Sequence, residues 1–369
     1  MKKLFKKVNA WLHLWLGLVS GILVFVISIT GCFIVFEQEL KDLLNPELRI
    51  APQEEHLLLP PSRLYETAAA AFPGREIYSV WYHGLNRAAH ISLAADSTLY
   101  VNPYTGALLA VKPHHDFFSF MEEGHTSLWM GRKIGHAVVS WSTFIFFLLL
   151  LSGIVLWFPK KWNKAGVNNS FKVKWKARWK RLNYDLHNVL GFYALLVAFV
   201  MAATGMIMGL SWFSKSVYWL TGGKTMERRE AAHVAPYPQH AIRLRVDEAW
   251  NKVRHEIALY NKHDIIASFP DEEDEPIYLC TDMKMGIWRD LYMDPNNLEL
   301  LPSSNKRITD LPFAGQLRKA NYGLHVGAIG GFATKLLYFL GSLICASLPV
   351  TGFYIWWHRG KKSGRKVTS

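Results

Sequence analysis

Cysteine is scarce in this chain, whose 369 residues include only three. Cys32 and Cys345 fall inside long apolar runs, and only Cys280 lies outside such a run. A structural disulfide needs two cysteines that meet in an oxidising compartment. We therefore expect no structural disulfide.

The sequence also lacks the short motifs of several enzyme classes. It has no Gly-x-Gly-x-x-Gly after a strand-like run, no P-loop, no nucleophile elbow and no His-Glu-x-x-His. These motifs bind nucleotides, carry a nucleophilic serine or hold catalytic zinc. No nucleotide or flavin domain is expected, so any electrons would come from a quinol, a reduced flavin or a separate reductase.

Acidic residues are missing from the four longest apolar runs. These runs cover residues 8–36, 134–159, 186–214 and 336–358. Each exceeds the roughly 20 residues that a helix needs to cross a bilayer. The fold class that follows is a membrane protein with an all-α bundle of four transmembrane helices. Because proton-driven transporters use carboxylates inside the membrane, their absence argues against that class.

The excess of basic residues is confined to three short segments, which together carry +18, whereas the rest of the chain carries −5 and the whole chain +13. Segments 1–36, 159–183 and 359–369 contain 4, 9 and 5 Lys or Arg and no Asp or Glu. Basic residues next to membrane helices mark the cytoplasmic side and contact anionic lipid, which argues against a nucleic-acid partner. We expect both termini and the 159–183 loop to be cytoplasmic, with the segments between the helix pairs outside.

The N-terminal run also has features of a lipoprotein signal, with Lys2-Lys3 before it and Cys32 near its end. The run is about twice as long as a signal core, and its Thr-Gly recurs later in the chain without a cysteine. We expect residues 1–36 to form a mature helix.

A motif with a histidine occurs in both the first and the third runs. Its copies are Leu12-His13, Gly17 and Thr30-Gly31, and then Leu186-His187, Gly191 and Thr204-Gly205. The offset between the copies is 174 residues throughout. An ionisable side chain inside the membrane normally has a partner, and two facing imidazoles suit a metal, with haem iron the leading candidate. The alternative is a pair of histidines bonded to nearby backbone.

The two glycines of this motif lie four residues after each histidine, on the same face of the helix. At Gly17 and Gly191 a flat macrocycle could approach the backbone closely. Close packing of neighbouring helices would explain these glycines nearly as well.

The second and fourth runs resemble each other too. Their shared residues are His125, Gly131 and Ser152-Gly153, and then His325, Gly331 and Thr351-Gly352. A unit of helix, exterior segment and helix thus occurs twice, which predicts an internal two-fold repeat. His125 and His325 would form a second ligand pair on the outer side, with His136 as the alternative to His125.

Basic pairs stand near these outer histidines, at Arg132-Lys133 and Arg318-Lys319. Such side chains would balance haem propionates or attract an anionic chelate. The alternative is ordinary snorkelling at the membrane surface. Eight other histidines are expected at the surface: His83, His90, His114, His115, His233, His240, His255 and His263.

Each exterior segment combines a helix with strand-like runs. The first has a helix at 61–72 and strands at 77–81, 88–93, 99–101 and 107–111, with an Asn-Pro turn before the last strand. The second has a helix at 246–256 and strands at 265–269, 277–280, 288–293 and 298–301, with an Asp-Pro turn. Alternating patterns joined by such turns predict two α+β domains built on hairpins.

These features together resemble the PepSY-associated transmembrane helix family of iron-regulated bacterial membrane proteins. The resemblance rests on the Leu-His and Thr-Gly spans, the strand-turn-strand segments and the Trp-Trp ending at 356–357, and it covers nearly the whole chain. One departure is the second turn, Asp294-Pro295-Asn296-Asn297, which lacks the Tyr-Thr-Gly of the first. Some members are inner-membrane ferric-siderophore reductases that hold two b-type haems among four helices.

The resemblance implies a bacterial inner-membrane oxidoreductase with two exterior PepSY-like domains in the periplasm. Electrons would enter at a haem held by His13 and His187 and leave from one held by His125 and His325 to reduce ferric iron, presented as a siderophore. Trp81, Tyr82, Trp129 and Tyr322 are candidate aromatic contacts for that substrate. The rival functions are a regulatory or binding protein without redox activity, and a haem or siderophore transporter.

The expected boundaries follow from the runs and the resemblance. They are helix 1 at 8–36, exterior domain 1 at 37–130, helix 2 at 131–159, the basic loop at 160–183, helix 3 at 184–214, exterior domain 2 at 215–325, helix 4 at 326–358 and the tail at 359–369.

Overall fold

The structure is a computed structural model that describes residues 2–94, 97–113, 115–159, 161–224, 233–260 and 262–358. The chain divides into two compact units. The bundle unit comprises Met1–Phe36, Phe117–Val217 and Asn321–Ser369, and the sheet unit comprises Glu37–Asp116 and Tyr218–Ala320. Each unit is made of two or three separate stretches of the sequence, so the chain passes between the units several times.

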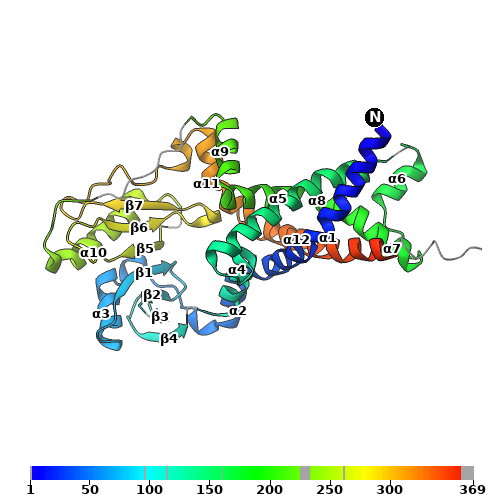
Figure 1. Cartoon of the computed structure of the whole chain (residues 1–369). Coiled ribbons are helices and arrows are strands. Elements are labelled where there is room, and N and C mark those ends of the chain that lie inside the picture. The colour runs from blue at the N-terminus through cyan, green and yellow to red at the C-terminus, as the bar shows by residue number, and fades with distance from the viewer. Residues whose placement is uncertain are drawn as a thin grey trace, which may run out of the picture. The chain divides into compact units, whose positions relative to one another are not determined.

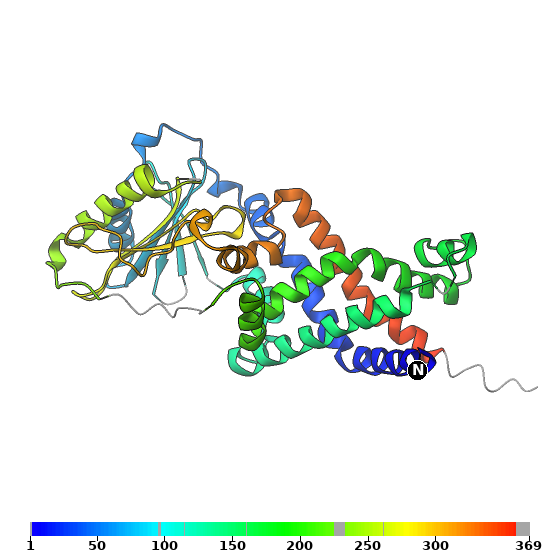
Figure 2. The ribbon, with the colours of Figure 1, turned by 90° about the horizontal axis from the view of Figure 1, so that it is seen from above.

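Four long helical segments form the bundle unit (Figures 1 and 2). They are α1 (Lys2–Ile34), α5 (Arg132–Trp157), the run of α7 (Trp179–Asp185), η3 (Leu186–Leu190) and α8 (Gly191–Gly209), and α12 (Gly331–Trp357). Each is long and apolar enough to cross a membrane. The predicted membrane-embedded helices are therefore present, and all four are longer than or shifted from the apolar runs.

The third of these segments begins earlier than its apolar run and includes an acidic residue. Asp185 is fully buried, and its Oδ1 lies 2.8 Å from Arg181 Nη2. The expectation that all four spans lack Asp and Glu is wrong for this segment. The run of apolar residues marks only the part of the helix that needs no ion pair, whereas the helix itself continues through Asp185 and its partner.

Small residues allow the long helices to approach one another. On α8 the residues Ala194, Ala198 and Ala202 are buried at a spacing of four, which places them on one face. On α1 a Cβ at Gly21 would lie 3.2 Å from Pro349 Cβ of α12. Membrane helices associate through such small-residue contacts because lipid offers no hydrophobic driving force.

Shorter helices complete the bundle unit. They are α4 (Phe117–Ser127), α6 (Lys164–Phe171), most of α9 (Ser211–Leu220) and the end of α11 (Phe313–His325). Between α4 and α5 the backbone turns sharply, with φ of 51° at Leu128, 56° at Trp129 and 75° at Gly131. The turn separates α4 from α5, so α4 packs back against α1.

The sheet unit contains one antiparallel sheet of seven strands in the order β4-β3-β2-β1-β5-β6-β7. The strands are β1 (Ile77–His83), β2 (Ala89–Leu93), β3 (Ser97–Val101), β4 (Leu108–Pro113), β5 (Asp264–Ser268), β6 (Ile277–Thr281) and β7 (Arg289–Met293). Strand β1 pairs with β5, with Trp81 opposite Ile266. The two exterior segments, expected as two domains, thus share one sheet and one compact unit.

Two helices cover one face of this sheet, α3 (Pro61–Ala71) and α10 (Ile242–Lys252) (Figure 1). Leu64 of α3 and Val246 of α10 are both completely buried, in the same core as Val80 and Leu279 of the strands. Alternate strand residues point into this core, as the period of two requires. The remaining elements are α2 (Glu37–Leu44), the π turn η5 (Val253–Ile257) after α10, and five short helices. These are η1 (Pro46–Leu48), η2 (Glu55–Leu57), η4 (Gln239–Ala241), η6 (Lys284–Gly286) and η7 (Ile308–Asp310).

The strand expected at 298–301 does not form. Only an isolated bridge joins Leu300 to Met293, and Leu298 has a φ of 59°. Pro302 follows, and proline has no N–H to extend a ladder. The Asp294 turn therefore closes on a single bridge, whereas the corresponding turn at Asn102 leads into strand β4.

Candidate functional site

Two pairs of histidines face one another inside the bundle unit. The rings of His13 and His187 have centroids 6.5 Å apart and planes at 89°. The rings of His125 and His325 have centroids 6.1 Å apart and planes at 56°. We call His13 with His187 the first pair and His125 with His325 the second pair. The four residues come from α1, η3, α4 and α11.

The two pairs lie at different levels of the bundle. His13 belongs to α1, and His125 Nδ1 lies 2.8 Å from the carbonyl oxygen of Ile27 on the same helix. Fourteen residues separate His13 from Ile27, a rise of about 21 Å at 1.5 Å per residue. The sites are thus stacked along the helices and separated by most of a hydrocarbon core of about 30 Å.

Hydroxyl groups fix the orientation of the first pair. His13 Nδ1 lies 2.7 Å from Ser152 Oγ of α5, and His187 Nδ1 lies 2.9 Å from Thr351 Oγ1 of α12. Each hydroxyl already donates its proton within its own helix, Ser152 to Leu149 O and Thr351 to Ser347 O. The hydroxyls must therefore accept, and each imidazole donates from Nδ1.

Backbone carbonyls fix the second pair in the same way. His125 Nδ1 donates to Ile27 O at 2.8 Å, and His325 Nδ1 donates to Met201 O at 3.1 Å. Thr204 Oγ1 also lies 3.0 Å from His325 Nδ1. A carbonyl oxygen can only accept, so Nδ1 carries the proton in both rings. In all four histidines the lone pair is left on Nε2, which is the nitrogen that can bind a metal.

Burial keeps the second pair neutral. It lowers the pKa of His325 to about 4, helped by the charge that His125 would carry, and it also lowers the pKa of His125. A neutral imidazole is the form that ligates a metal.

A glycine lies against each histidine ring. A Cβ added to Gly31 would lie 3.2 Å from His125 Cε1, and one on Gly205 would lie 3.3 Å from His325 Cε1. For the first pair, a Cβ on Gly153 would lie 3.5 Å from His13 Cε1, and one on Gly352 would lie 3.3 Å from His187 Cε1. Each ring thus packs against the glycine of a Ser-Gly or Thr-Gly dipeptide, and we call these four dipeptides the seats of the rings. The glycine makes room for each ring, and at the first pair the hydroxyl residue also orients it.

An asparagine anchors three of the four seats. Asn9, Asn183 and Asn321 each lie four residues before a histidine, on the same helix face. Their side-chain amides donate to the carbonyl oxygens of Ser152, Thr351 and Thr204 at 3.1, 3.0 and 3.1 Å. The seat of His125 has Met121 at the corresponding position. The Asn-x-x-x-His spacing is visible in the sequence, although the sequence analysis did not use it.

The spacing of each pair fits one metal ion between two imidazoles. Two metal–nitrogen bonds of about 2.0 Å, plus about 1.1 Å from each nitrogen to its ring centroid, give a separation of roughly 6.2 Å. The observed centroid distances of 6.5 and 6.1 Å bracket that value. Within the described ranges, which omit the segments named above, no group of three or more His, Cys, Asp or Glu is placed to hold a metal ion. Among the described residues, the donor set at each level is therefore two imidazoles, a set that could hold a haem iron.

His187 occupies a π-helical turn. The segment Leu186–Leu190 forms this turn between α7 and α8. Turns of this type are rare and frequently occur at functional sites, because the extra residue redirects a side chain.

The other predicted site residues lie elsewhere. His136, the alternative to His125, is exposed on α5, as are Arg132 and Lys133. Arg318 is exposed in the sheet-unit part of α11, and Lys319 Nζ there lies 5.6 Å from the centroid of the Trp288 ring. The structure brings none of these side chains into the hydrogen bonds described above.

Gly17 and Gly191 each face a leucine of a neighbouring helix. A Cβ on Gly17 would lie 3.9 Å from Leu149 Cδ2, and one on Gly191 would lie 3.4 Å from Leu348 Cδ2. Both distances are those of ordinary van der Waals contact, which agrees with helix packing at these glycines. A role in admitting a macrocycle stays a prediction.

Two residues expected at a surface are withdrawn from solvent in the sheet unit, Tyr82 fully and His83 partly. Tyr82, a candidate substrate contact, is 1% exposed, and its hydroxyl donates to Leu59 O at 2.7 Å. His83 Nε2 lies 2.8 Å from His90 Nδ1, and burial holds the pKa of His83 well below its usual value, with His90 and Arg87 adding to the effect. Both belong to β1, where neighbouring residues point to opposite faces. Tyr82 packs on Trp250 of α10, with ring centroids 5.0 Å apart, whereas His83 packs with Trp81 and His90. His114 lies outside the described residues.

Comparison with known protein families gives one result that spans the chain. The family described as the PepSY-associated TM region matches residues 10–359. The match therefore includes both histidine pairs, all four seats and the whole sheet. Comparison with curated proteins gives no match.

Proposed function

The chain belongs to the family of the PepSY-associated TM region, and on that premise we propose that it is a membrane oxidoreductase. It holds two b-type haems, one between His13 and His187 and the other between His125 and His325. Its substrate is ferric iron, presented as a siderophore chelate and reduced on the periplasmic side of the inner membrane.

The observation that carries this proposal is the common state of the four histidines. Every Nδ1 is engaged by an acceptor on a neighbouring helix, and the paired rings are spaced for a single metal. A bound haem would supply a one-electron carrier at each level. Two imidazoles at each level would leave a bound haem no open position for oxygen, which would favour electron transfer.

The residues around the rings hold this ligand geometry in place. Ser152 and Thr351 keep the first pair in the Nδ1-protonated tautomer, and Ile27 O and Met201 O do so for the second pair. Such contacts raise the basicity of the ligating nitrogen and fix the ring plane. Because the groups are preorganised within rigid helices, little rearrangement would accompany a change in iron charge.

The same contacts support an internal two-fold repeat. His13 and His125 have their seats on α5 and α1, which belong to the first half of the chain. His187 and His325 have theirs on α12 and α8, in the second half. Each half supplies one histidine to each pair. A two-fold relation between the halves would produce this arrangement.

The two levels support transfer of electrons across a membrane. The rise of about 21 Å between them is most of a bilayer core. The basic segments favour cytoplasmic termini, so the first pair lies on the cytoplasmic side and the sheet unit lies in the periplasm. A quinol, a reduced flavin or a reductase delivers electrons at the first pair.

The visible spectrum of the purified full-length protein tests the proposal. We expect a Soret band, b-type bands after reduction by dithionite, two haems per chain, and reoxidation when a ferric chelate is added. A colourless protein would contradict the proposal and leave a regulatory or binding function. If ferric chelates fail to reoxidise the reduced protein, the assignment of the haems would stand and ferric chelates would be excluded as the substrate.

A further inference from the structure

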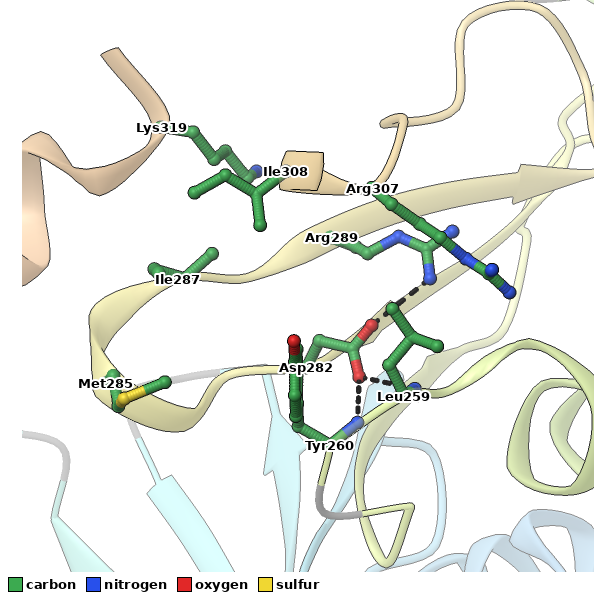
Figure 3. A pocket seen from close by; sticks show the side chains of 9 residues that line it. All are labelled: Leu259, Tyr260, Asp282, Met285, Ile287, Arg289, Arg307, Ile308 and Lys319. Atoms are coloured by element: carbon green, nitrogen blue, oxygen red, sulfur yellow. Dashed lines mark hydrogen bonds and ion pairs between the residues drawn. The ribbon is translucent and has the colours of Figure 1, made fainter. Parts of the chain in front are cut away.

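The charged groups around a small cavity of the sheet unit join parts of the chain to one another (Figure 3). Asp282 Oδ1 accepts from the backbone N–H groups of Leu259 and Tyr260, both at 2.8 Å, and its Oδ2 accepts from Arg289 Nη1 at 3.1 Å. This carboxylate fastens the β6–β7 connection to the segment after η5 and to β7. The feature that bears on the proposed function lies in the bundle unit, at the turn between α4 and α5.

His125 differs from the other three paired histidines in how its helix is held. An asparagine four residues earlier ties each of the others to a seat, whereas Met121 occupies that position before His125. A methionine side chain has no N–H to donate to a carbonyl oxygen. Helix α4 is also short and ends at Ser127, two residues after the histidine. The position of His125 therefore needs another support.

The indole of Trp129 packs against the last turns of α4. Its Nε1 donates to Phe120 O at 2.8 Å, and the two aromatic rings stack with centroids 4.9 Å apart and planes at 26°. A Cβ added to Gly124 would lie only 2.3 Å from Trp129 Cζ2, so the indole occupies the space that a side chain would need. Phe120 and Gly124 are four residues apart and hence on one face of the helix. The indole covers this face.

His125 projects from a different side of the same helix. It follows Gly124 and is therefore rotated from it by about 100° around the helix axis. On that side its Nδ1 donates to Ile27 O of α1 at 2.8 Å. The indole and α1 thus hold the end of α4 from two sides.

The turn that carries the indole is tightly closed. Leu128 and Trp129 have φ of 51° and 56°, in the left-handed region that residues other than glycine seldom adopt. A Cβ added to Gly135 of α5 would lie 1.9 Å from Ser127 O, so the backbones of α4 and α5 meet directly beside the turn. Strained backbone persists only where its surroundings hold it, and it concentrates at functional sites.

We propose that Trp129 is a positioning residue for His125 and does for α4 what an asparagine does for the other three histidines. By packing along Phe120 and Gly124, the indole keeps His125 Nδ1 on Ile27 O and the ring in the second pair. The consequence for a haem rests on the proposed function, whereas the positioning of α4 does not. On this inference Trp129 is not an aromatic contact for the substrate.

Binding of carbon monoxide to the dithionite-reduced full-length protein tests the inference. An iron with two imidazole ligands has no position free for carbon monoxide, whereas an iron that has lost one imidazole has such a position. We expect the wild type not to bind carbon monoxide. Trp129→Ala should bind it at one of the two haems, or lose that haem, and the affected signal should be the one that His325→Ala removes.

Two further variants calibrate this result. Trp129→Phe keeps an aromatic ring but has no N–H for Phe120 O, so it should bind carbon monoxide to a smaller extent than Trp129→Ala. Trp141→Ala removes an exposed tryptophan of α5 whose ring contacts Phe144, and it should behave as the wild type does.

Gly124→Ala tests the same contact without changing the tryptophan. Alanine favours a helix more than glycine does, so the variant should not weaken α4 itself. Its Cβ would displace the indole, and we expect carbon monoxide to bind at the same single haem. The inference is overturned if neither Gly124→Ala nor Trp129→Ala opens a haem to carbon monoxide. Loss of both haems from Gly124→Ala would also overturn it, by showing a general structural role.

Hydrogen exchange separates this inference from the proposed function, because it does not need a haem. Trp129→Ala should speed exchange of the α4 amides by about tenfold and leave those of α12 unchanged. Faster exchange in a protein that contains no haem would support the positioning role and contradict the oxidoreductase. Two haems closed to carbon monoxide, with unchanged exchange in α4, would contradict the positioning role alone. If only the rate of chelate reduction falls, Trp129 is a substrate contact and the inference is wrong.

Discussion

His13 and Ser152 are 139 residues apart in the sequence, yet Ser152 Oγ accepts a hydrogen bond of 2.7 Å from His13 Nδ1. This hydroxyl sets the tautomer of the histidine, whose ring centroid lies 6.5 Å from that of His187. The relationship recurs between His187 and Thr351 at 2.9 Å. Ser152 and Thr351 thus orient the two rings to which the proposed function assigns a haem.

Ser152→Ala should weaken haem binding at the first pair by about 10–100-fold, because the contacts that orient ligating histidines contribute that much to metal affinity. The measurement is the haem content of the purified variant, with redox titration of what remains. Ser20→Ala is the matched control, since Ser20 Oγ is buried and bonds only to Leu16 O within α1. A variant at Ser152 with unchanged haem content and potential would show that the hydroxyl has no role in ligation.

Removing one histidine of a pair should cause loss of the haem at that level and leave the haem at the other level in place. His325→Ala takes away a single imidazole of the second pair, so we expect loss of one of the two b-type signals. His187→Ala should remove the complementary signal, because the pairs lie about 21 Å apart along α1. Redox-resolved spectra of the two variants provide the measurement. If either change abolishes both signals, the assignment of residues to pairs is contradicted.

Alanine at the seat glycines should disturb the rings by steric contact. A Cβ at Gly205 would lie 3.3 Å from His325 Cε1, and one at Gly352 the same distance from His187 Cε1. These contacts are closer than ordinary van der Waals separation, so the ring must shift by a few tenths of an ångström. We expect about tenfold weaker haem binding at the affected level only. The two variants control for each other, and electron paramagnetic resonance of the oxidised protein reports which level has changed. Loss at both levels from one variant would indicate general damage to the bundle.

Acid should destabilise the sheet unit through His83. Burial lowers the pKa of His83 well below 6.5 in the folded state, so as the pH falls below about 6.5 the unfolded chain takes up a proton that the folded chain does not. Stability is therefore fully present above that pH and declines below it, by up to about 1.4 kcal/mol per pH unit, until the folded-state pKa is reached.

Hydrogen exchange of the β1 amides between pH 7.5 and 5, corrected for intrinsic rates, measures this decline. His83→Gln should flatten the pH dependence, whereas His240→Gln, at an exposed position, should leave it unchanged. An identical slope in the His83 variant would assign the acid sensitivity to other groups.

Local patterns predicted the elements of this fold well. The four spans followed from uncharged runs longer than a bilayer, and seven strands followed from alternating residues between turns. The joining of β1 to β5 had no local signal, because pairing between strands far apart in the chain depends on the whole fold. The expected strand at 298–301 failed because its pattern was too short to outweigh Leu298 and Pro302.

The competition between His125 and His136 shows what spacing alone cannot decide. The sequence predicted His125 in the outer pair and left His136 open as the alternative. In the structure, the positive φ angles at Leu128, Trp129 and Gly131 fold α4 back, so that His125 reaches Ile27 of α1. Positive φ at residues other than glycine is uncommon, and neither Leu128 nor Trp129 signals it in the sequence.

The division of seats and pairs makes each half of the chain an incomplete ligand set. A fragment ending before residue 160 would keep the seats of His13 and His125 but would offer one imidazole at each level. It would also expose β1 as an open sheet edge. Two such fragments could complete the histidine pairs only by associating with each other, which would depend on protein concentration. Because one chain contains both halves, the pairs form within a single molecule at any concentration.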